Sequence, residues 1–201
     1  MSLFQPLSFP RAYIAFQRAV GADRLRYLCM DRLALKPGDR VLDIGCGPGY
    51  YLDRLPAGVR YDGYDTSGRY IAYARRRHWG SGIAFHHRSY HADASSGRGQ
   101  FTAVILMGIL HHLPDEECRE LLGQVSEALT DGGCVVSVDT CFSPGQGIVS
   151  RWMSENDRGS FVRTSESLLS LAGDVFLDVS GDVLDGVTRI PGSYLTMCMR
   201  P

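Results

Sequence analysis

A glycine-rich loop that directly follows an apolar strand is the feature that most constrains what this chain can fold into. The segment reads Val41-Leu42-Asp43-Ile44-Gly45-Cys46-Gly47-Pro48-Gly49. A strand that ends in an acid and runs into Gly-x-Gly-x-Gly must turn tightly and let a ligand approach the backbone. Glycine permits both, because it lacks Cβ and tolerates positive φ. The loop predicts an α/β fold with a ligand site at the carboxyl end of this strand.

Segments of strand and helix character alternate on both sides of the loop. Residues 11–34 carry apolar positions at helical spacing with a break near Gly21, which predicts two short amphipathic helices. After the loop we expect a helix at 50–55, a strand at 60–64, a helix at 69–78 and a strand at 83–87. Residues 101–106 are typical of a strand buried on both faces, and a helix with an acidic first turn follows Pro114. With a strand at 134–139, this order predicts a doubly wound, mostly parallel sheet.

The pattern loosens after residue 139 and then resumes. We expect a helix at 165–171 and two final strands, at 175–179 and 194–199, which pair as a hairpin and close the sheet with an antiparallel strand. The length of 201 residues, with 44% hydrophobic residues, suits one domain with a substantial core.

Composition excludes several classes of function. The net charge is −1 with acids and bases interspersed, so neither a nucleic acid nor an anionic membrane surface is expected as a partner. Arg75-Arg76-Arg77 is interpreted as the solvated end of a helix. No stretch approaches the roughly 20 apolar residues of a membrane span, and the N-terminus lacks the pattern of a signal peptide, so a cytoplasmic location is expected. Six cysteines without ligand spacing predict reduced thiols, with no disulfide framework and no metal.

The spacing of the loop also discriminates between ligands. The dinucleotide fingerprint GxGxxG requires glycine at position 50, which is Tyr50 here, and no Tyr-x-x-x-Lys pair for hydride transfer is present. Asp43 instead suits a ligand with an ammonium group, bound by backbone carbonyls and, through water, by this acid. Asp65 ends the next strand, where a carboxylate can accept both hydroxyls of a ribose.

With the segment 101–113 and the turn 131–133, these motifs resemble the class I S-adenosylmethionine-dependent methyltransferases, over about residues 36–140. The resemblance implies a Rossmann-like, doubly wound, seven-stranded, mostly parallel sheet with a C-terminal antiparallel strand, and S-adenosyl-L-methionine as cofactor. We expect one methyltransferase domain over 1–201, in which N-terminal helices within 1–35 cover the cofactor site and 36–201 form the core. Expected cofactor contacts are Tyr13, Gln17, Asp43, Gly45, Cys46, Gly47, Gly49, Asp65, Thr66, Met107 and Gly108, the last two beside the sulfonium.

Two departures from the family pattern concern the third and fourth strands. Many relatives carry an acid directly after the third strand, against the adenine amino group, whereas residues 85–89 read Phe-His-His-Arg-Ser. The adenine contact is therefore left open, and Asp93 is a poor substitute. The usual Phe-Asp that opens the fourth strand is Phe101-Thr102, a structural position.

The N-terminal Tyr13-x-x-x-Gln17, together with Asp157-Arg158-Gly159 and Arg163, resembles a bacterial subgroup of small methyltransferases. Tyr13 and Gln17 lie one helical turn apart. They either form a lid over the cofactor carboxylate or belong to a helix that simply packs on the sheet.

Candidates for catalysis follow the fourth strand. Methyl transfer from a sulfonium needs alignment and desolvation, and a base helps only when the acceptor must lose a proton. His111 and His112 are the candidates for that base. The alternative is that one of them packs under the loop or bonds to its backbone. His86, His87 and His91 form a looser group, at which we expect no metal.

The acceptor pocket is expected from the N-terminal helices, residues 139–156 and residues 158–163. Phe142 and Trp152 either stack on a flat substrate or plug the pocket. Arg158 and Arg163 either bind an acidic acceptor or, as we favour, pair with Asp157 or Glu166.

The leading hypothesis is methyl transfer to a small-molecule acceptor, at oxygen first and nitrogen or carbon next. The alternative is a non-catalytic or repurposed S-adenosylmethionine-binding protein. The sequence leaves the acceptor and the oligomeric state, monomer or homodimer, open.

Overall fold

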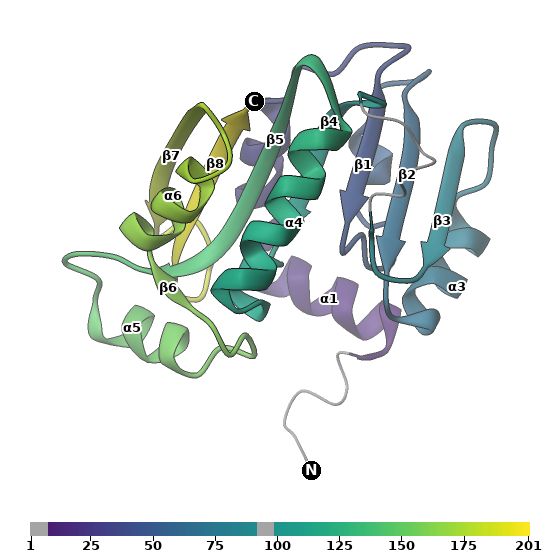
Figure 1. The fold of residues 1–201 in the computed structure, drawn as a ribbon. Helices are drawn as coiled ribbons and strands as arrows, with labels where there is room; N and C mark the ends of the chain where they lie inside the picture. Colours follow the sequence, from purple (N-terminus) through teal and green to yellow (C-terminus); the bar gives the residue numbers. More distant parts are fainter. Residues whose placement is uncertain (1–7, 92–98) are drawn as a thin grey trace.

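A central sheet organises the chain in the computed structural model, which describes residues 8–91 and 99–201 (Figure 1). Along its path the strands run in the order β3-β2-β1-β4-β5-β8-β7. Strands β1 to β5 pair in parallel, whereas β8 is antiparallel to both of its neighbours. The strands are β1 Arg40–Ile44, β2 Arg60–Asp65, β3 Ile83–His87, β4 Phe101–Met107, β5 Leu129–Phe142, β7 Asp178–Asp185 and β8 Ser193–Arg200, with the two-residue β6 Arg163–Thr164 paired to β5.

This arrangement confirms the predicted fold class. The seven strands on the path, within the described residues, include the expected antiparallel strand near the C-terminus, and β6 adds an eighth strand beside β5.

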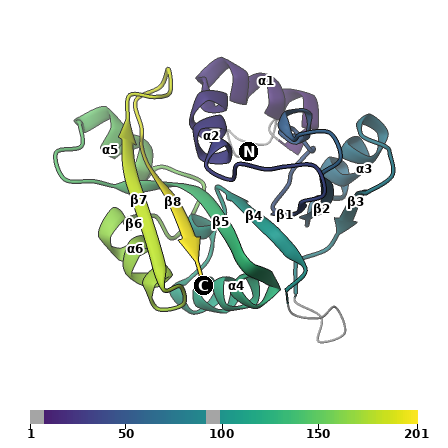
Figure 2. The ribbon, with the colours of Figure 1, turned by 90° about the horizontal axis from the view of Figure 1, so that it is seen from above.

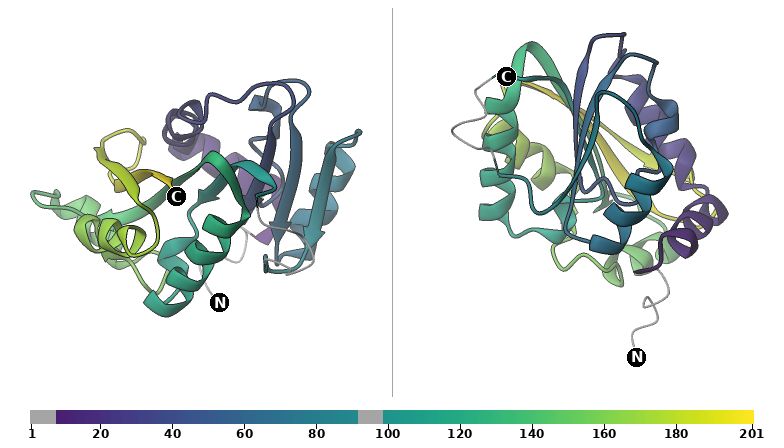
Figure 3. Two further views of the ribbon diagram at one scale, coloured as in Figure 1. Left: turned by 45° about the horizontal axis from the view of Figure 1, so that its top comes forward. Right: turned by 90° about the vertical axis from the view of Figure 1, so that its right-hand side faces the viewer.

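Helices cover both faces of the sheet, as the alternating pattern predicts (Figure 2). Helix α2 and helix α3 pack on one face together with α1, and α4 and α6 pack on the other. The right-hand view of Figure 3 looks across the sheet and shows the helices on each side of it. The helices are α1 Pro10–Val20, α2 Ala22–Asp31, α3 Gly68–Arg77, α4 Asp115–Ala128, α5 Ile148–Glu155 and α6 Ser165–Gly173.

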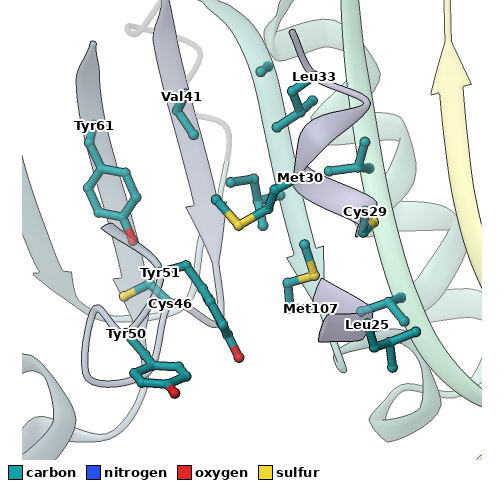
Figure 4. Packing of buried hydrophobic residues seen from close by; sticks show 14 of the residues in the cluster. Leu25, Cys29, Met30, Leu33, Val41, Cys46, Tyr50, Tyr51, Tyr61 and Met107 are labelled. Carbon is teal, nitrogen blue, oxygen red and sulfur yellow. The ribbon is translucent and has the colours of Figure 1, made fainter. Parts of the chain in front are cut away.

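The break between the first two helices lies at the predicted residue. Gly21 has a φ of 75°, which ends α1 in the left-handed conformation and lets α2 start at the next residue. The chain thereby forms two short helices, of 11 and 10 residues, instead of one long helix. Figure 4 shows the result, in which Cys29, Met30 and Met107 pack in the space between α2 and the strands.

The predicted helix at 50–55 is wrong. Only a 3-10 turn, η2 Leu52–Arg54, follows the glycine loop, and Pro56 comes directly after its C-cap. Tyr50, the first residue of the predicted helix, bonds to the N-terminal helices, because its Oη donates to Asp23 Oδ2 at 2.8 Å and accepts from Arg18 Nε at 3.1 Å. These bonds tie the start of the predicted helix to α1 and α2.

The final hairpin is confirmed, but its first strand begins three residues later than predicted. Val175 N and Phe176 N both bond to Ala172 O, which extends the turn that ends α6, and Phe176 is buried. The chain is therefore free to pair with β8 only from Asp178. Strand β5 is also longer than the predicted 134–139, because it pairs with β4 from Leu129 onward through an irregular register.

Two other features concern the chain as a whole. All six cysteines are buried free thiols. Among the described helices, none is both long enough and apolar enough to cross a membrane.

The carboxyl ends of the parallel strands meet at one edge of the sheet. In Figure 1 this is the lower edge, where α1 and α5 also lie. In open α/β sheets ligands bind at this edge, beside the point where the strand order reverses. Here that point lies between β1 and β4.

Candidate functional site

The glycine loop follows β1 at this edge. Gly45, Gly47 and Gly49 all have positive φ, at 73°, 56° and 68°. Gly45 N and Cys46 N both donate to Tyr64 O, at 2.8 and 3.0 Å, which ties the loop to β2. A Cβ on Gly47 would meet no atom within 4 Å although Gly47 itself is buried, so open space lies beside this residue. Such space is what the close approach of a ligand to the backbone requires.

Asp65 stands at the end of β2, as predicted, and faces the loop. Its Oδ2 accepts from Gly47 N at 2.8 Å and its Oδ1 accepts from Ser67 N at 2.7 Å. Burial raises the pKa of this carboxyl, while the two backbone donors oppose that rise. Each oxygen keeps a lone pair, because a carboxylate offers about four acceptor sites. Asp65 is therefore held in one orientation with acceptor capacity to spare.

A first cavity of about 660 Å³ opens beside Asp65. Gly45 and Thr66 also line it, and aromatic side chains form one wall. The rings of Tyr64 and Tyr90 meet edge to face at 5.2 Å, and His86 stacks on Tyr64 at 4.3 Å. The full lining is Ile44, Gly45, Tyr64, Asp65, Thr66, Arg88, Ser89, Tyr90, His91, Ile109, His112, Leu113, Glu117, Glu120, Leu121 and Gln124.

The wall from α4 was not anticipated from the sequence. Glu117 and Glu120, both on α4, are among the residues that line this cavity. They supply acidic groups where the sequence lacks the acid expected directly after β3. Asp93, the poor substitute considered for that contact, lies outside the described residues.

A second cavity, of about 230 Å³, lies on the other side of the β4 end. It is enclosed by α1, α2, the ends of β4 and β5, and residues 153–158. The lining is Tyr13, Phe16, Gln17, Val20, Ala22, Leu25, Arg26, Met107, Gly108, His111, His112, Val138, Thr140, Met153, Asn156, Asp157, Arg158, Ile190 and Tyr194. The residues predicted on α1 and at the end of β4 thus line the same cavity.

Arg26 is the group that brings the α1 residues together, and sequence reasoning missed it. Its Nη1 donates to Gln17 Oε1 at 2.6 Å and its Nη2 donates to Tyr13 Oη at 3.4 Å. Its guanidinium also lies 5.2 Å from the centre of the Tyr51 ring. Residues 13, 17 and 26 meet because the turn at Gly21 folds α2 back beside α1. A basic residue one helix later was the only signal in the sequence.

Four predicted residues are not part of either cavity lining. Asp43, Cys46, Gly47 and Gly49 line neither cavity. Asp43 is buried, and its Oδ2 accepts from Tyr61 Oη at 2.7 Å. Burial raises the pKa of Asp43 to about 7 despite this bond. Its contact with a ligand stays a prediction and, from this position, requires a bridging group.

His111 is bonded at both ring nitrogens. Its Nδ1 lies 2.7 Å from Asp139 Oδ1 and its Nε2 lies 3.3 Å from Asp157 Oδ1. Burial by itself would lower the pKa of His111, but the bonds to the two carboxylates outweigh burial and raise it to about 9. With this pKa, the ring is an imidazolium at neutral pH and has no lone pair available for a proton.

His112 has the opposite electrostatic environment. It lines both cavities and is the residue that the two linings share. Burial and the positive charge of His111 lower the pKa of His112, so its ring is neutral at pH 7. A pair of like groups whose pKa values are pushed apart is a common signature of acid and base assignments.

Other predicted residues take different places. Arg163 pairs with Asp115 at 2.7 Å, not with Asp157 or Glu166 as we favoured, because its side chain points toward the start of α4. Phe142 and Trp152 line neither cavity, and Trp152 is 58% exposed. His87 Nε2 lies 3.1 Å from Thr66 O. No group of three potential metal ligands occurs among the described residues.

Comparison with known protein families gives two matches to the sequence. A family described as "Methyltransferase domain" matches residues 41–133, which contain the glycine loop, Asp65 and both histidines. A second, described as "Protein-L-isoaspartate(D-aspartate) O-methyltransferase", matches residues 8–65.

Several curated relatives carry the name ubiquinone biosynthesis O-methyltransferase. That of Chelativorans sp. (strain BNC1) is 30% identical over 173 residues, which cover 79% of this chain and 68% of the relative. That of Aromatoleum aromaticum is 38% identical over 94 residues, 45% of this chain and 40% of the relative. The matched part is thus well under two thirds of the length of the Aromatoleum relative.

Solved structures share the fold at low sequence identity. A putative methyltransferase in complex with the Trm112 methyltransferase activator of Haloferax volcanii superposes with a TM-score of 0.73 at 16% identity, covering all of this chain and 98% of that one. The [4+2]-cyclase SpnF superposes with a TM-score of 0.67 at 21% identity, covering 90% of this chain and 81% of that one. At these identities the likeness concerns the fold alone.

Proposed function

The chain belongs to the class I S-adenosylmethionine-dependent methyltransferases, and from this premise we propose that it transfers the methyl group of S-adenosyl-L-methionine to the oxygen of a small hydroxylated acceptor. The observation that carries the proposal is the position of His112, a neutral imidazole shared by the walls of both cavities. The first cavity is then the adenosine site, and the second takes the methionine end and the acceptor.

The residues at hand fit the cofactor at each of its parts. The spare lone pairs of Asp65 suit the ribose hydroxyls, and Tyr64 and Tyr90 offer ring faces and edges to the adenine. The open space at Gly47 suits the close approach of the ligand to the loop. At the other end, Arg26 is a fixed cation suited to the methionine carboxylate. Tyr13 and Gln17 then act through Arg26, which they hold in place, rather than as a direct lid.

The chemistry requires little of the protein beyond position. The cofactor supplies a methyl group that the positive sulfur makes electrophilic, so transfer depends on alignment and on the exclusion of water. Met107 and Gly108 end β4 in the wall of the second cavity. His112 accepts the proton of the acceptor hydroxyl at its neutral ring, and His111, already protonated, stays as a fixed positive charge.

Oxygen is the favoured acceptor atom for two reasons. A hydroxyl must lose a proton in the reaction, which gives a neutral histidine at this place a task. In addition, the curated relatives described above are named O-methyltransferases. A cavity of about 230 Å³ admits only a small reacting group next to the methionine end. Nitrogen and carbon acceptors are the next candidates.

The test is transfer of labelled methyl from S-adenosylmethionine to a panel of phenols and catechols, with wild type and the variant His112→Gln. We expect kcat to fall by about 10²- to 10⁴-fold in the variant, the range of general base catalysis. The dissociation constant of S-adenosylhomocysteine, measured by calorimetry, serves as the control and should stay within about twofold. Equal kcat values in both proteins would refute the role of His112.

A second candidate function keeps the cofactor site but not the transfer. SpnF, which has this fold, is named a cyclase, so the fold does not by itself require methyl transfer. In this alternative the protein binds S-adenosylmethionine and no label moves to any acceptor in the panel. Binding of NAD in preference to S-adenosylmethionine would overturn both candidates.

A further inference from the structure

The segment between α5 and β6, residues 156–162, closes one side of the second cavity. Its first three residues, Asn156, Asp157 and Arg158, line that cavity. The segment makes its contacts with η3 Leu110–His112, the short turn that carries both histidines. Two parts of the chain that are distant in sequence thus hold each other over the same space.

Backbone contacts bring the two parts together. Phe161 N donates to His111 O at 3.0 Å. Gly159 packs so closely on His111 that a Cβ there would lie 2.1 Å from the ring carbon Cδ2 and 2.5 Å from the backbone oxygen. Arg163, at the start of β6, donates to Leu110 O at 2.9 Å and to Leu113 O at 2.6 Å. Only glycine at position 159 permits this approach.

The side-chain contact is an ion pair. Asp157 Oδ1 accepts from His111 Nε2 at 3.3 Å and also from Gly159 N at 2.7 Å. On the other side of the ring, Asp139 Oδ1 accepts from His111 Nδ1 at 2.7 Å and from His111 N at 3.2 Å. One ring therefore bridges the end of β5 and the closing segment.

We propose that His111 and Asp157 form a latch that holds residues 156–162 closed over the acceptor cavity, and that His111 is a positioning residue of the site. The inference rests on the proposed function for the meaning of the cavity, but the latch itself is defined by contacts that need no substrate. Closing the segment excludes water from the acceptor and fixes the turn that presents His112.

The chemistry of imidazole makes the latch dependent on protonation. A charged ring has two N–H donors and satisfies both carboxylates, whereas a neutral ring has only one. The shorter bond, to Asp139, retains the remaining proton, so the lone pair on Nε2 then faces Asp157 and repels it. Loss of the proton therefore releases the closing segment and leaves the β5 side in place.

The charged and titratable groups around the ring of His111 favour its protonated form at neutral pH. Asp139 on β5 and Asp157 on the segment favour the imidazolium, whereas His112 on η3 is neutral at pH 7. Arg158 adds a positive charge near His112, on the cavity side. The two carboxylates dominate, and the pKa of His111 is about 9.

Limited digestion with trypsin tests the closed state without any acceptor, because the Arg158–Gly159 bond lies within the latched segment. At pH 8 we expect Asp157→Ala and Asp157→Asn to raise the rate of cleavage after Arg158 by about tenfold. The matched control is Glu155→Gln, which removes a charge two residues away that pairs only with the exposed Arg151 in the described structure. Its cleavage rate should stay within twofold of wild type.

A pH profile separates a charged latch from a merely structural turn. Hydrogen-exchange protection of the Phe161 amide, corrected for the intrinsic rate, should fall in wild type as pH rises through about 9. In Asp157→Asn the midpoint should move to lower pH, because one of the two carboxylates that favour the imidazolium is gone. His111→Gln should show low protection at every pH. An unchanged midpoint in Asp157→Asn, or cleavage no faster than in Glu155→Gln, would overturn the latch.

The outcomes keep the two proposals distinct. If the wild-type protein moves no label to any acceptor but Asp157→Ala still opens the segment, the proposed function fails and the latch stands. If label moves, Asp157→Asn should lower kcat/KM for the acceptor, while the dissociation constant of S-adenosylhomocysteine stays within twofold.

Discussion

Gly47→Ala should separate cofactor binding from folding, because the structure gives this glycine a strained backbone and open surroundings. Its φ of 56° costs an L-residue about 1–2 kcal/mol. The lower entropy of the unfolded alanine chain returns about 0.4–1 kcal/mol of that cost. No atom lies within 4 Å of the added Cβ, so no steric term follows. The expected loss of stability is about 1 kcal/mol, or about 2–4 °C in Tm for a domain of this size.

The added methyl group should act mainly on the ligand. It occupies the open space at which we propose that the cofactor approaches the backbone, so the affinity for S-adenosylhomocysteine should fall by at least tenfold, about 1.4 kcal/mol. The bond from residue 47 N to Asp65 Oδ2 is retained in the variant, because alanine keeps the amide. The loss of affinity can then be assigned to the space and not to a freed carboxylate.

Gly45→Ala is the matched comparison two residues earlier. Its φ of 73° carries the same backbone cost, but its Cβ would lie 2.1 Å from Ile109 Cδ1. Displacing that side chain adds about 1–3 kcal/mol, the usual range of overpacking. The double variant Gly45→Ala with Ile109→Val, which removes the clashing atom, should recover part of the stability.

Calorimetry with S-adenosylhomocysteine gives the affinity, and thermal unfolding without ligand gives the stability. Wild-type affinity in Gly47→Ala, together with the small loss in Tm, would refute the reasoning, because the cofactor would then not approach this part of the loop. A large loss of Tm in Gly47→Ala would show instead that the open space is filled in the free protein.

Three further predictions concern buried groups. His111 should contribute up to about 3 kcal/mol of stability, since its pKa rises from 6.5 to about 9 on folding. That contribution is fully present below pH 6.5 and is lost as pH rises through about 9, so urea unfolding between pH 6 and 10 should show a decline that His111→Gln abolishes. Tyr61→Phe removes a hydrogen-bond donor from buried Asp43 and should cost about 1–3 kcal/mol, with a larger loss at pH 8 than at pH 5.5 because Asp43 ionises near pH 7. Arg26→Met should weaken S-adenosylhomocysteine binding by about 10- to 100-fold in calorimetry, whereas Arg24→Met, exposed on the same helix, should leave it unchanged.

The strand order and the glycine loop were predictable because their signals are local. An apolar run followed by glycines needs only neighbouring residues to define a strand, a tight turn and a ligand approach. The helix expected at 50–55 failed for the converse reason. Tyr50 looks like the start of a helix in sequence, but its hydroxyl bonds to Asp23, 27 residues away. A hydrogen bond to so distant a residue has no signal in the sequence around Tyr50.

Arg26 shows the same limit at the second cavity. The sequence pointed to Tyr13 and Gln17 together because they lie one helical turn apart, and both residues line the second cavity. It gave no reason to add a basic residue from the next helix. Their hydrogen bonds depend on the angle between α1 and α2, which Gly21 sets through its left-handed backbone. Such an angle is a property of packing and has no signature of its own in the sequence.

His111 and His112 give the clearest case, because they are chemically identical and adjacent. The sequence alone does not distinguish them as candidates for the base. In the structure, Asp139 is 28 residues from His111 and bonds to one side of its ring, while Asp157 bonds to the other. The charge thus stabilised on His111 lowers the pKa of His112, which faces the cavities. The two carboxylates therefore act on His112 in two ways, since the charge that they stabilise on His111 lowers the pKa of His112 while their own negative charges raise it, so removing Asp157 should alter both closure of the segment and the pKa of His112.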